Sequence, residues 1–253
     1  MFRQLKHLLW LTALLLAACG DGPEKPETKA KSAASSAAAG LPPTPPWPPL
    51  VQDGAKLADD PLARNYYIVF DASGSMADRD CSEGASKLAA AKLAVASFAR
   101  SIPKGANVGL AVFGQGGIAE RLPLTAKSRE QLDVTVRRVA AGGGTPLRSA
   151  MDLGVRALTA QGRRQLGYGE YHLVVITDGE FNPSSEDPRA SVDEILRKTP
   201  IVVHTLGFCI GEKHSLNQPG RVLYKAANSQ KELEQGLAAV LAESPEFKLG
   251  QFQ

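Results

Sequence analysis

Residues 67–76 read YIVFDASGSM, and this stretch is the strongest indication of the fold in the chain. Large apolar residues are followed at once by a carboxylate, a glycine and two hydroxyls. The run LVVITDG at residues 173–179 has the same order, with apolar residues first and Asp178 soon after them. Short apolar runs of this kind predict buried strands of a parallel sheet. Because ligands bind where loops leave the carboxyl ends of such strands, we expect the polar residues of both runs in one crevice.

The region 65–243 alternates between strand and helix patterns. Apolar residues recur at helical spacing from Leu88 to Ile102, and Pro103 ends that helix. Alternating strands and helices predict an α/β fold: a doubly wound, mostly parallel sheet with helices on both faces. Further strands are expected at 108–112, 121–124, 201–208 and 222–224. Further helices are expected at 146–159 and from Asp187-Pro188. Two more should begin with capping boxes, one formed by Ser128 with Gln131 and the other by Ser229 with Glu232.

Five oxygen-bearing side chains at the predicted strand ends and helix starts suit a hard divalent cation. Carboxylates and hydroxyls are ligands for magnesium, manganese or calcium, whereas the pattern offers no thiolate or imidazole set for zinc. Magnesium takes about six oxygens, so five protein groups leave at least one coordination position open. Two carboxylates balance the charge of the ion, which can still attract an outside carboxylate. The candidate ligands are Asp71, Ser73, Ser75, Thr145 (in GGGTPL) and Asp178.

These five residues form the pattern DxSxS, then a threonine, then an aspartate after a second strand. The pattern resembles the metal-ion-dependent adhesion site of von Willebrand factor type A (VWA) domains, and the resemblance covers residues 65–243. It implies that the serines bind the metal directly, the threonine directly or through water, and the aspartates largely through water. It also implies a divalent cation, Mg²⁺ before Mn²⁺ or Ca²⁺, and a protein partner that presents an acidic side chain.

Each candidate ligand also has an interpretation without a metal. The two aspartates suit turns or helix caps after strands, and the two serines suit a turn that contains glycine. Thr145 has the position of a helix N-cap, with Pro146 as the first helical residue. Glycines 142–144 before that helix suggest an anion site, but the lysine of a phosphate-binding loop is absent. A close backbone approach to the metal site explains these glycines better.

Residues 1–18 have the layout of a lipoprotein signal peptide. A basic start with Arg3 and Lys6 precedes an apolar core shorter than the roughly 20 residues that span a bilayer. The end LAAC resembles the bacterial lipobox, which implies that Cys19 carries a diacylglycerol and an acyl chain such as palmitate. Several chains on one residue give a stable membrane anchor. We expect a location in the bacterial cell envelope, with Gly20 favouring the outer over the inner membrane; the alternative is an ordinary signal peptide with a chance cysteine.

Residues 19–64 are expected to form a disordered linker that starts at the lipidated cysteine. The small, polar segment 29–40 predicts a flexible tether, and the proline-rich segment LPPTPPWPPL at 41–50 predicts a stiffer extended spacer. An alternative for the proline-rich segment is a ligand for a proline-recognition module. Trp47 in this segment can pack on the domain or on a partner, and the sequence leaves the two open. Residues 244–253 are expected to be a C-terminal tail.

The net charge limits the class of partner, and the cysteines bear on the redox compartment. The formal net charge of +3 falls to +1 when residues 1–18, with two basic residues and no acid, are removed. This balance disfavours nucleic acid, which requires a basic surface. Cys81 and Cys209 follow strand ends at the same sheet edge, which predicts a disulfide in an oxidising compartment. Two reduced thiols are the alternative, because a disulfide needs Cα atoms within roughly 7 Å. His214, in the long loop 210–221, is expected to be exposed, with a contact to the site as the alternative.

The sequence favours a metal-dependent protein-binding module, used for adhesion or as a scaffold, and no enzyme. The first alternative is a metal-dependent phosphohydrolase with Asp71 as the nucleophile. Position 73 is then a serine where such enzymes have a second aspartate, and neither a matching catalytic lysine nor a G-x-S-x-G elbow is found. The second alternative is a scaffold with a vestigial metal site. No catalytic residue is assigned.

Overall fold

A computed structural model describes residues 46–49, 56–80 and 84–242. The strands of this part of the chain are β1 (Arg64–Ala72), β2 (Asn107–Gly114), β3 (Gly117–Thr125), β4 (Glu170–Thr177), β5 (Val202–Phe208) and β6 (Leu223–Ala227). They form one sheet in the order β3-β2-β1-β4-β5-β6. The β2–β3 pair is antiparallel and the other neighbouring pairs are parallel. The predicted doubly wound, mostly parallel sheet is confirmed.

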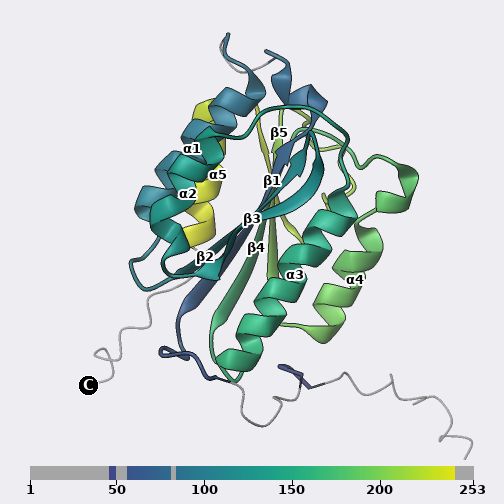
Figure 1. Cartoon of the computed structure of the whole chain (residues 1–253). Helices are drawn as coiled ribbons and strands as arrows, with labels where there is room; N and C mark the ends of the chain where they lie inside the picture. The colour runs from purple at the N-terminus through teal and green to yellow at the C-terminus, as the bar shows by residue number, and fades with distance from the viewer. Residues whose placement is uncertain (1–45, 50–55, 81–83, 243–253) are drawn as a thin grey trace, which may run out of the picture. The chain divides into compact units, whose positions relative to one another are not determined.

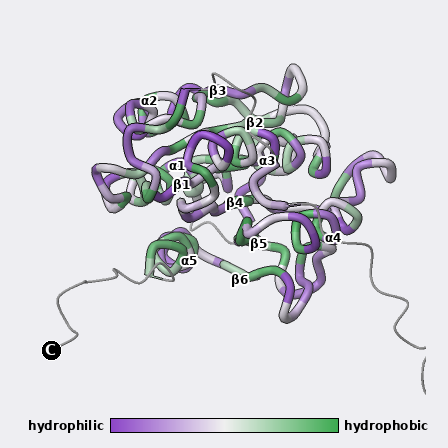
Figure 2. Tube along the Cα trace, turned by 90° about the horizontal axis from the view of Figure 1, so that it is seen from below, coloured by the Kyte–Doolittle hydropathy of each residue, from purple (hydrophilic) through white to green (hydrophobic). Residues whose placement is uncertain are grey.

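Helices cover both faces of this sheet. They are α1 (Lys87–Ser101), α2 (Ser128–Arg137), α3 (Leu147–Arg164), α4 (Arg189–Lys198) and α5 (Gln230–Ala242), with short 3-10 helices η1 (Gly74–Ala77) and η2 (Ser184–Glu186). Figures 1 and 2 show α1, α2 and α5 on one face and α3 and α4 on the other. Each face has its own apolar core, one containing Phe98, Leu132 and Leu237, the other Met151 and Ile195.

The central strand β1 is buried on both faces. Ile68 and Phe70 belong to the core under α1, α2 and α5, whereas Tyr67 and Val69 belong to the core under α3 and α4. A strand with this environment needs large apolar residues at successive positions, so it shows no alternation with polar ones. This explains the uninterrupted run YIVF that precedes the polar turn.

The sheet order places the ends of β1 and β4 side by side. From β1 the chain passes through α1 to β2 on one side, and from β4 it passes through α4 to β5 on the other side. Such a reversal opens a crevice at the carboxyl ends of the two strands. The register pairs Phe70 with Ile176, so the next residues, Asp71 and Thr177, lie at the same level at this edge.

Several element boundaries and helix caps differ from those predicted. The short strand expected at 121–124 is the nine-residue antiparallel edge strand β3. The capping box at Ser128 is wrong: Lys127 has the N-cap position, and the Ser128 hydroxyl instead donates to the carbonyl of Pro123 at 2.6 Å. Half of the box before α5 is present: the Ser229 hydroxyl accepts the backbone N–H of Glu232 at 3.2 Å, but the Glu232 carboxylate accepts the N–H of Asn228 and not that of Ser229. Local spacing cannot show which carbonyls a nearby strand offers, which is why the first box failed.

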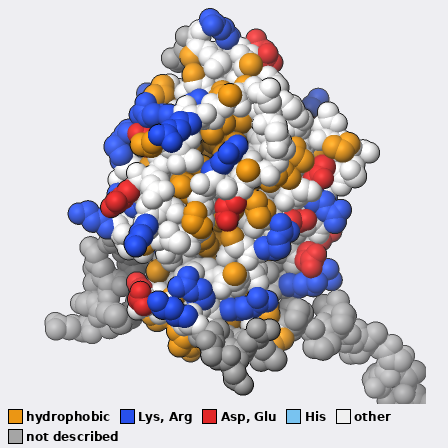
Figure 3. Space-filling model, viewed as in Figure 1, with side chains coloured by type: hydrophobic (Ala, Val, Ile, Leu, Met, Phe, Trp, Pro, Cys, Tyr) orange, Lys and Arg blue, Asp and Glu red, His pale blue; other side chains and the backbone are white. Residues whose placement is uncertain are grey.

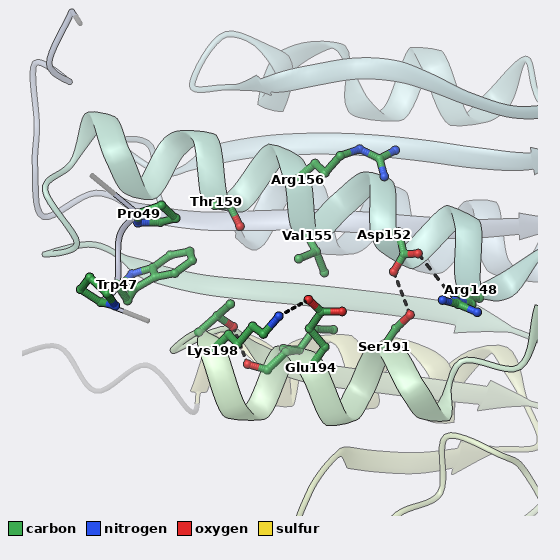
Figure 4. Close-up of a pocket in the computed structure, with 13 residues that line it drawn as sticks. Trp47, Pro49, Arg148, Asp152, Val155, Arg156, Thr159, Ser191, Glu194 and Lys198 are labelled. Atoms are coloured by element: carbon green, nitrogen blue, oxygen red, sulfur yellow. Dashed lines mark hydrogen bonds and ion pairs between the residues drawn. The ribbon is translucent and has the colours of Figure 1, made fainter. Parts of the chain in front are cut away.

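Trp47 packs on the folded domain. Its ring lies edge-on to Tyr171 with a centroid distance of 5.4 Å, and it covers Gly162, where an added Cβ would come within 2.6 Å of the indole. Figure 4 shows Trp47 and Pro49 at one end of a groove of about 330 Å³ between α3 and α4, with Val155 on the α3 side. Residues 46–49 therefore belong to the folded unit and not to the expected disordered linker.

Some predictions fall on residues that the structure does not describe. Residues 1–18, Cys19, Cys81 and the tail 244–253 lie outside the described part of the chain. Cys209 is disulfide-bonded, and its Sγ lies 3.5 Å from the carbonyl oxygen of Asp80. The pairing of Cys209 with Cys81 stays a prediction. Within the described ranges, no helix combines the length and apolar character needed to cross a membrane.

Two buried histidines face each other across β4 and β5. The Nδ1 atom of His172 lies 3.1 Å from Nε2 of His204, and the His172 ring stacks on Tyr66 with centroids 5.0 Å apart. Burial lowers the pKa of both histidines, although Glu170 partly opposes the shift at His172. The pKa of His204 falls to about 3, mainly through burial and secondly through the neighbouring His172. Both rings therefore stay neutral in the folded chain at neutral pH.

We expect the His204 position to destabilise the protein as the pH falls below 6.5. In the unfolded chain this side chain takes up a proton near pH 6.5, whereas in the folded chain it stays neutral down to about pH 3. The free energy of unfolding is therefore highest above pH 6.5, and about 2 kcal/mol of it is lost at pH 5. Urea denaturation at pH 7.5 and pH 5 should show a smaller pH-dependent loss in His204→Gln than in the wild type. An equal loss in both proteins would assign the effect to other groups.

Candidate metal centre

Asp71, the last residue but one of β1, is a fully buried carboxylate with a hydrogen bond on each oxygen. Its Oδ1 accepts the backbone N–H of Ser73 and its Oδ2 accepts the hydroxyl of Thr177, each at 2.7 Å. Burial raises the pKa of Asp71 to about 6; the hydrogen bonds from Ser73 and Thr177 oppose this shift, and the charge of Asp178 adds to it. A negative charge in this position is costly, so a nearby cation would stabilise it.

The glycine loop 142–144 lies directly against the turn that contains Ser73 and Ser75. The backbone N–H of Gly74 donates to the carbonyl of Gly143 at 3.0 Å, and that of Gly142 donates to the carbonyl of Ala72 at 2.9 Å. Gly143 has a φ of 81°, and an added Cβ would lie 2.5 Å from the carbonyl oxygen of Gly114. The predicted close backbone approach of this loop is confirmed.

The polar side chains after β1 and β4 meet in one hydrogen-bonded cluster. The exposed Ser75 donates its hydroxyl to Oδ1 of Asp178 at 2.8 Å, and its oxygen lies 3.1 Å from the hydroxyl oxygen of Ser73. Ser73 and Asp178 are buried, with 2% and 4% of their surface exposed. The cluster therefore opens to solvent on the side of Ser75 and is closed beneath by the strand ends.

The backbone of Thr145 is bonded to the loop that follows Asp178. Its carbonyl accepts the N–H of Asn182, in the loop after β4, at 2.9 Å. The alternative role as a helix cap is wrong, because Pro146 has the N-cap position of α3 and the carboxylate of Glu186 accepts the backbone N–H of Ser149 in the first turn, at 2.8 Å. Pro146 also precedes the first helical residue, Leu147, and does not itself start the helix. The role of the Thr145 hydroxyl as a metal ligand stays a prediction.

Lys87 belongs to this site although the sequence pattern did not indicate it. It is the first residue of α1, and its ammonium lies 3.0 Å from Oδ2 of Asp178. The two side chains are 8% and 0% exposed, so this is a buried ion pair. Lysine side chains are normally exposed to solvent, so the sequence predicts no buried ion pair here. Lys87 is also 91 positions away from Asp178 in the chain. No local signal could have identified the pair.

His214 is not the exposed loop residue that the sequence favoured. It is 7% exposed, and its Nε2 lies 2.9 Å from the carbonyl oxygen of Gly179, the residue after Asp178. Its Nδ1 accepts the backbone N–H of Leu216 at 3.0 Å, which leaves the proton on Nε2 to donate to Gly179. The loop 210–221 therefore folds back and supports the segment that carries Asp178.

The donor set fits a hard divalent cation. It consists of two carboxylates and three hydroxyls, which are the oxygen ligands that Mg²⁺, Mn²⁺ and Ca²⁺ take. No cluster of three or more His, Cys, Asp or Glu side chains suitable for a metal occurs among the described residues. A site built mainly from hydroxyls contains too few such residues to form a cluster of that kind. Zinc sites with thiolate and imidazole ligands are therefore not indicated in this part of the chain.

Comparisons with known proteins agree with this fold. Residues 66–180 match the family model described as von Willebrand factor type A domain. The Bacillus subtilis (strain 168) protein YwmC is 28% identical over 188 residues, which cover 67% of this chain and 79% of that protein.

Solved structures show the same fold at low sequence identity. Proximal thread matrix protein 1 from the mussel byssus, with a zinc-occupied MIDAS motif, is 18% identical with a TM-score of 0.56, over 74% of this chain and 48% of that chain. This chain thus spans about half the length of the mussel structure. The vWF domain of the type V pili tip protein Mfa5 from Porphyromonas gingivalis is 9% identical with a TM-score of 0.55, over 76% of this chain and 99% of that chain.

Proposed function

We propose that this chain, whose residues 66–180 match the von Willebrand factor type A family model, is a membrane-anchored module of the bacterial cell envelope that binds a protein partner through a divalent cation. The observation that carries the proposal is the connection between three loops. The loop after β1 bonds to the glycine loop through Gly74, the glycine loop bonds to the loop after β4 through Thr145, and Ser75 joins the first to the third. This arrangement supports a metal site in which the five oxygen ligands share one surface opening.

The cation and the partner follow from the chemistry of these ligands. Mg²⁺ is the first choice for an oxygen-only site, with Mn²⁺ and Ca²⁺ as alternatives. An ion with an open coordination position binds an outside carboxylate, so the partner presents an acidic side chain. The zinc in the MIDAS motif of the mussel protein and the position of Mfa5 at a pilus tip support a divalent cation and a binding role. The face in Figure 3 carries Asp and Glu side chains among more numerous Lys and Arg side chains. The formal net charge of the whole chain is only +3, which supports a protein partner over nucleic acid.

The anchor in this proposal is the lipidated Cys19, which places the module in the bacterial envelope and, with Gly20 after it, at the outer membrane. The motif LAAC at 16–19 and the apolar segment before it support this assignment. Mass spectrometry of the N-terminal peptide, after expression in a bacterium with lipoprotein processing, tests it. A free Cys19 thiol in the mature protein would contradict the anchor and leave the metal site unaffected.

We expect Mg²⁺ to raise the melting temperature of the full chain and a chelator to reverse the effect. The Thr145→Val variant keeps the shape of the side chain and removes its hydroxyl, so it should weaken Mg²⁺ binding by about ten-fold or more. Isothermal titration calorimetry with Mg²⁺ measures the difference.

Thr159→Val is the matched control, because Thr159 lies on α3 and none of the candidate ligands lines its groove. Its Mg²⁺ affinity should equal that of the wild type. If Mg²⁺, Mn²⁺ and Ca²⁺ all fail to bind the wild-type protein, the proposed metal-dependent function is wrong and the scaffold alternative gains support.

A further inference from the structure

Lys87 is placed where a helix disfavours a positive charge. It is the first residue of α1, after the N-cap Ser86, whose hydroxyl accepts the N–H of Ala89. The N-terminus of a helix carries a partial positive charge, so a lysine there is repelled unless a carboxylate compensates it. Asp178 supplies that carboxylate at 3.0 Å, in a buried position.

Both oxygens of Asp178 are engaged in this arrangement. Oδ1 accepts the hydroxyl of Ser75, and Oδ2 contacts the ammonium of Lys87. The charges within the site are thus two carboxylates, Asp71 and Asp178, and one ammonium, with a sum of −1. A divalent cation that enters the site meets this ammonium in surroundings where charges are poorly screened.

We propose that the Lys87 ammonium competes with the divalent cation for Asp178, so that metal binding breaks this ion pair and Lys87 sets the metal affinity of the site. The inference rests on the proposed metal site and adds a residue to it that the DxSxS pattern does not contain. Lys87 acts here as an internal cation that stabilises Asp178 in the metal-free protein. Its presence lowers the affinity of the site for the metal.

The test measures metal binding in variants of the full chain that remove or keep the positive charge at position 87. Lys87→Met removes the ammonium and keeps a side chain of similar length, whereas Lys87→Arg keeps a positive charge. Lys92→Met is the matched control on the same helix, because the Lys92 ammonium bonds to the carbonyls of Arg137 and Val139, at the end of α2. We expect Lys87→Met to bind Mg²⁺ and Mn²⁺ about ten-fold more tightly than the wild type, with both other variants within about two-fold.

A second measurement uses the wild type and does not depend on how well the variants fold. In protein labelled with ¹³C and ¹⁵N at lysine, the side-chain NMR signals of Lys87 should shift as Mg²⁺ is added, and those of Lys92 should not. Tighter binding in Lys87→Met together with this shift supports the proposal. Binding in the wild type with equal or weaker binding in Lys87→Met, or no shift at Lys87, overturns it and leaves the metal site intact. Absence of metal binding in both proteins overturns the metal site as well.

Discussion

Replacing Asp71 by Asn should weaken metal binding by about 10- to 100-fold while the protein stays folded. The substitution removes one of the two carboxylates among the five candidate ligands, and loss of such a group typically costs about this much in metal affinity. Calorimetric titration with Mg²⁺ and Mn²⁺ measures this loss. The phosphohydrolase alternative predicts turnover of a phosphatase substrate that disappears in the same variant.

The surroundings of Asp71 explain why the fold should tolerate the change. The amide oxygen of the new side chain can still accept the N–H of Ser73, and its NH₂ group can donate to the hydroxyl oxygen of Thr177. Thr177 then donates to the carbonyl of Gly179, 3.1 Å away. Because burial already disfavours the charged form of Asp71, the unfolding free energy without metal should stay equal or rise. A marked fall in metal-free stability would show that the carboxylate is needed for folding, and the variant would no longer isolate metal binding.

Replacing Gly143 by Ala should damage both the fold and the site. Gly143 has a φ of 81°, and its Cβ would lie 2.5 Å from the carbonyl oxygen and 2.7 Å from the carbonyl carbon of Gly114. Left-handed backbone at a non-glycine residue costs about 1–2 kcal/mol, and the overlap with backbone atoms that cannot rotate away adds to it. We expect a total loss of about 3 kcal/mol in unfolding free energy, measured by urea denaturation without metal.

The neighbouring Gly144 offers a matched control. An added Cβ at Gly144 would meet only the carbonyl oxygen of Asn182, at 3.6 Å, which is an ordinary contact. Gly144→Ala should therefore change stability by less than about 1 kcal/mol. In the Gly143→Ala variant the loop must move away from Gly74, whose N–H bonds to the Gly143 carbonyl, so metal affinity should fall as well. Equal effects of the two substitutions would contradict the close approach of this loop.

Much of the fold follows from local patterns in the sequence. The uninterrupted apolar run before Asp71 predicts a strand buried on both faces, and β1 is such a strand. Helical spacing from Leu88 to Ile102 predicts the buried side of α1, where Leu88, Val95 and Phe98 are buried. These predictions succeed because hydrophobic periodicity is a property of adjacent residues. They do not give exact boundaries, since a cap or a strand end depends on neighbours in space, as at Ser128 and Pro146.

The candidate site, too, is predictable from the sequence only in part. The ligand chemistry after β1 and β4 can be predicted from the sequence alone, because carboxylates and hydroxyls directly after buried strands must lie at one edge of a parallel sheet. Thr145 lies between α2 and α3, so this reasoning does not place it. How these groups are paired emerges only in three dimensions: Lys87 with Asp178, His214 with the carbonyl of Gly179, and Gly143 with Gly74. Ion pairs and hydrogen bonds act over a few ångströms, and the packing of helices and loops far apart in the chain brings their partners within that range.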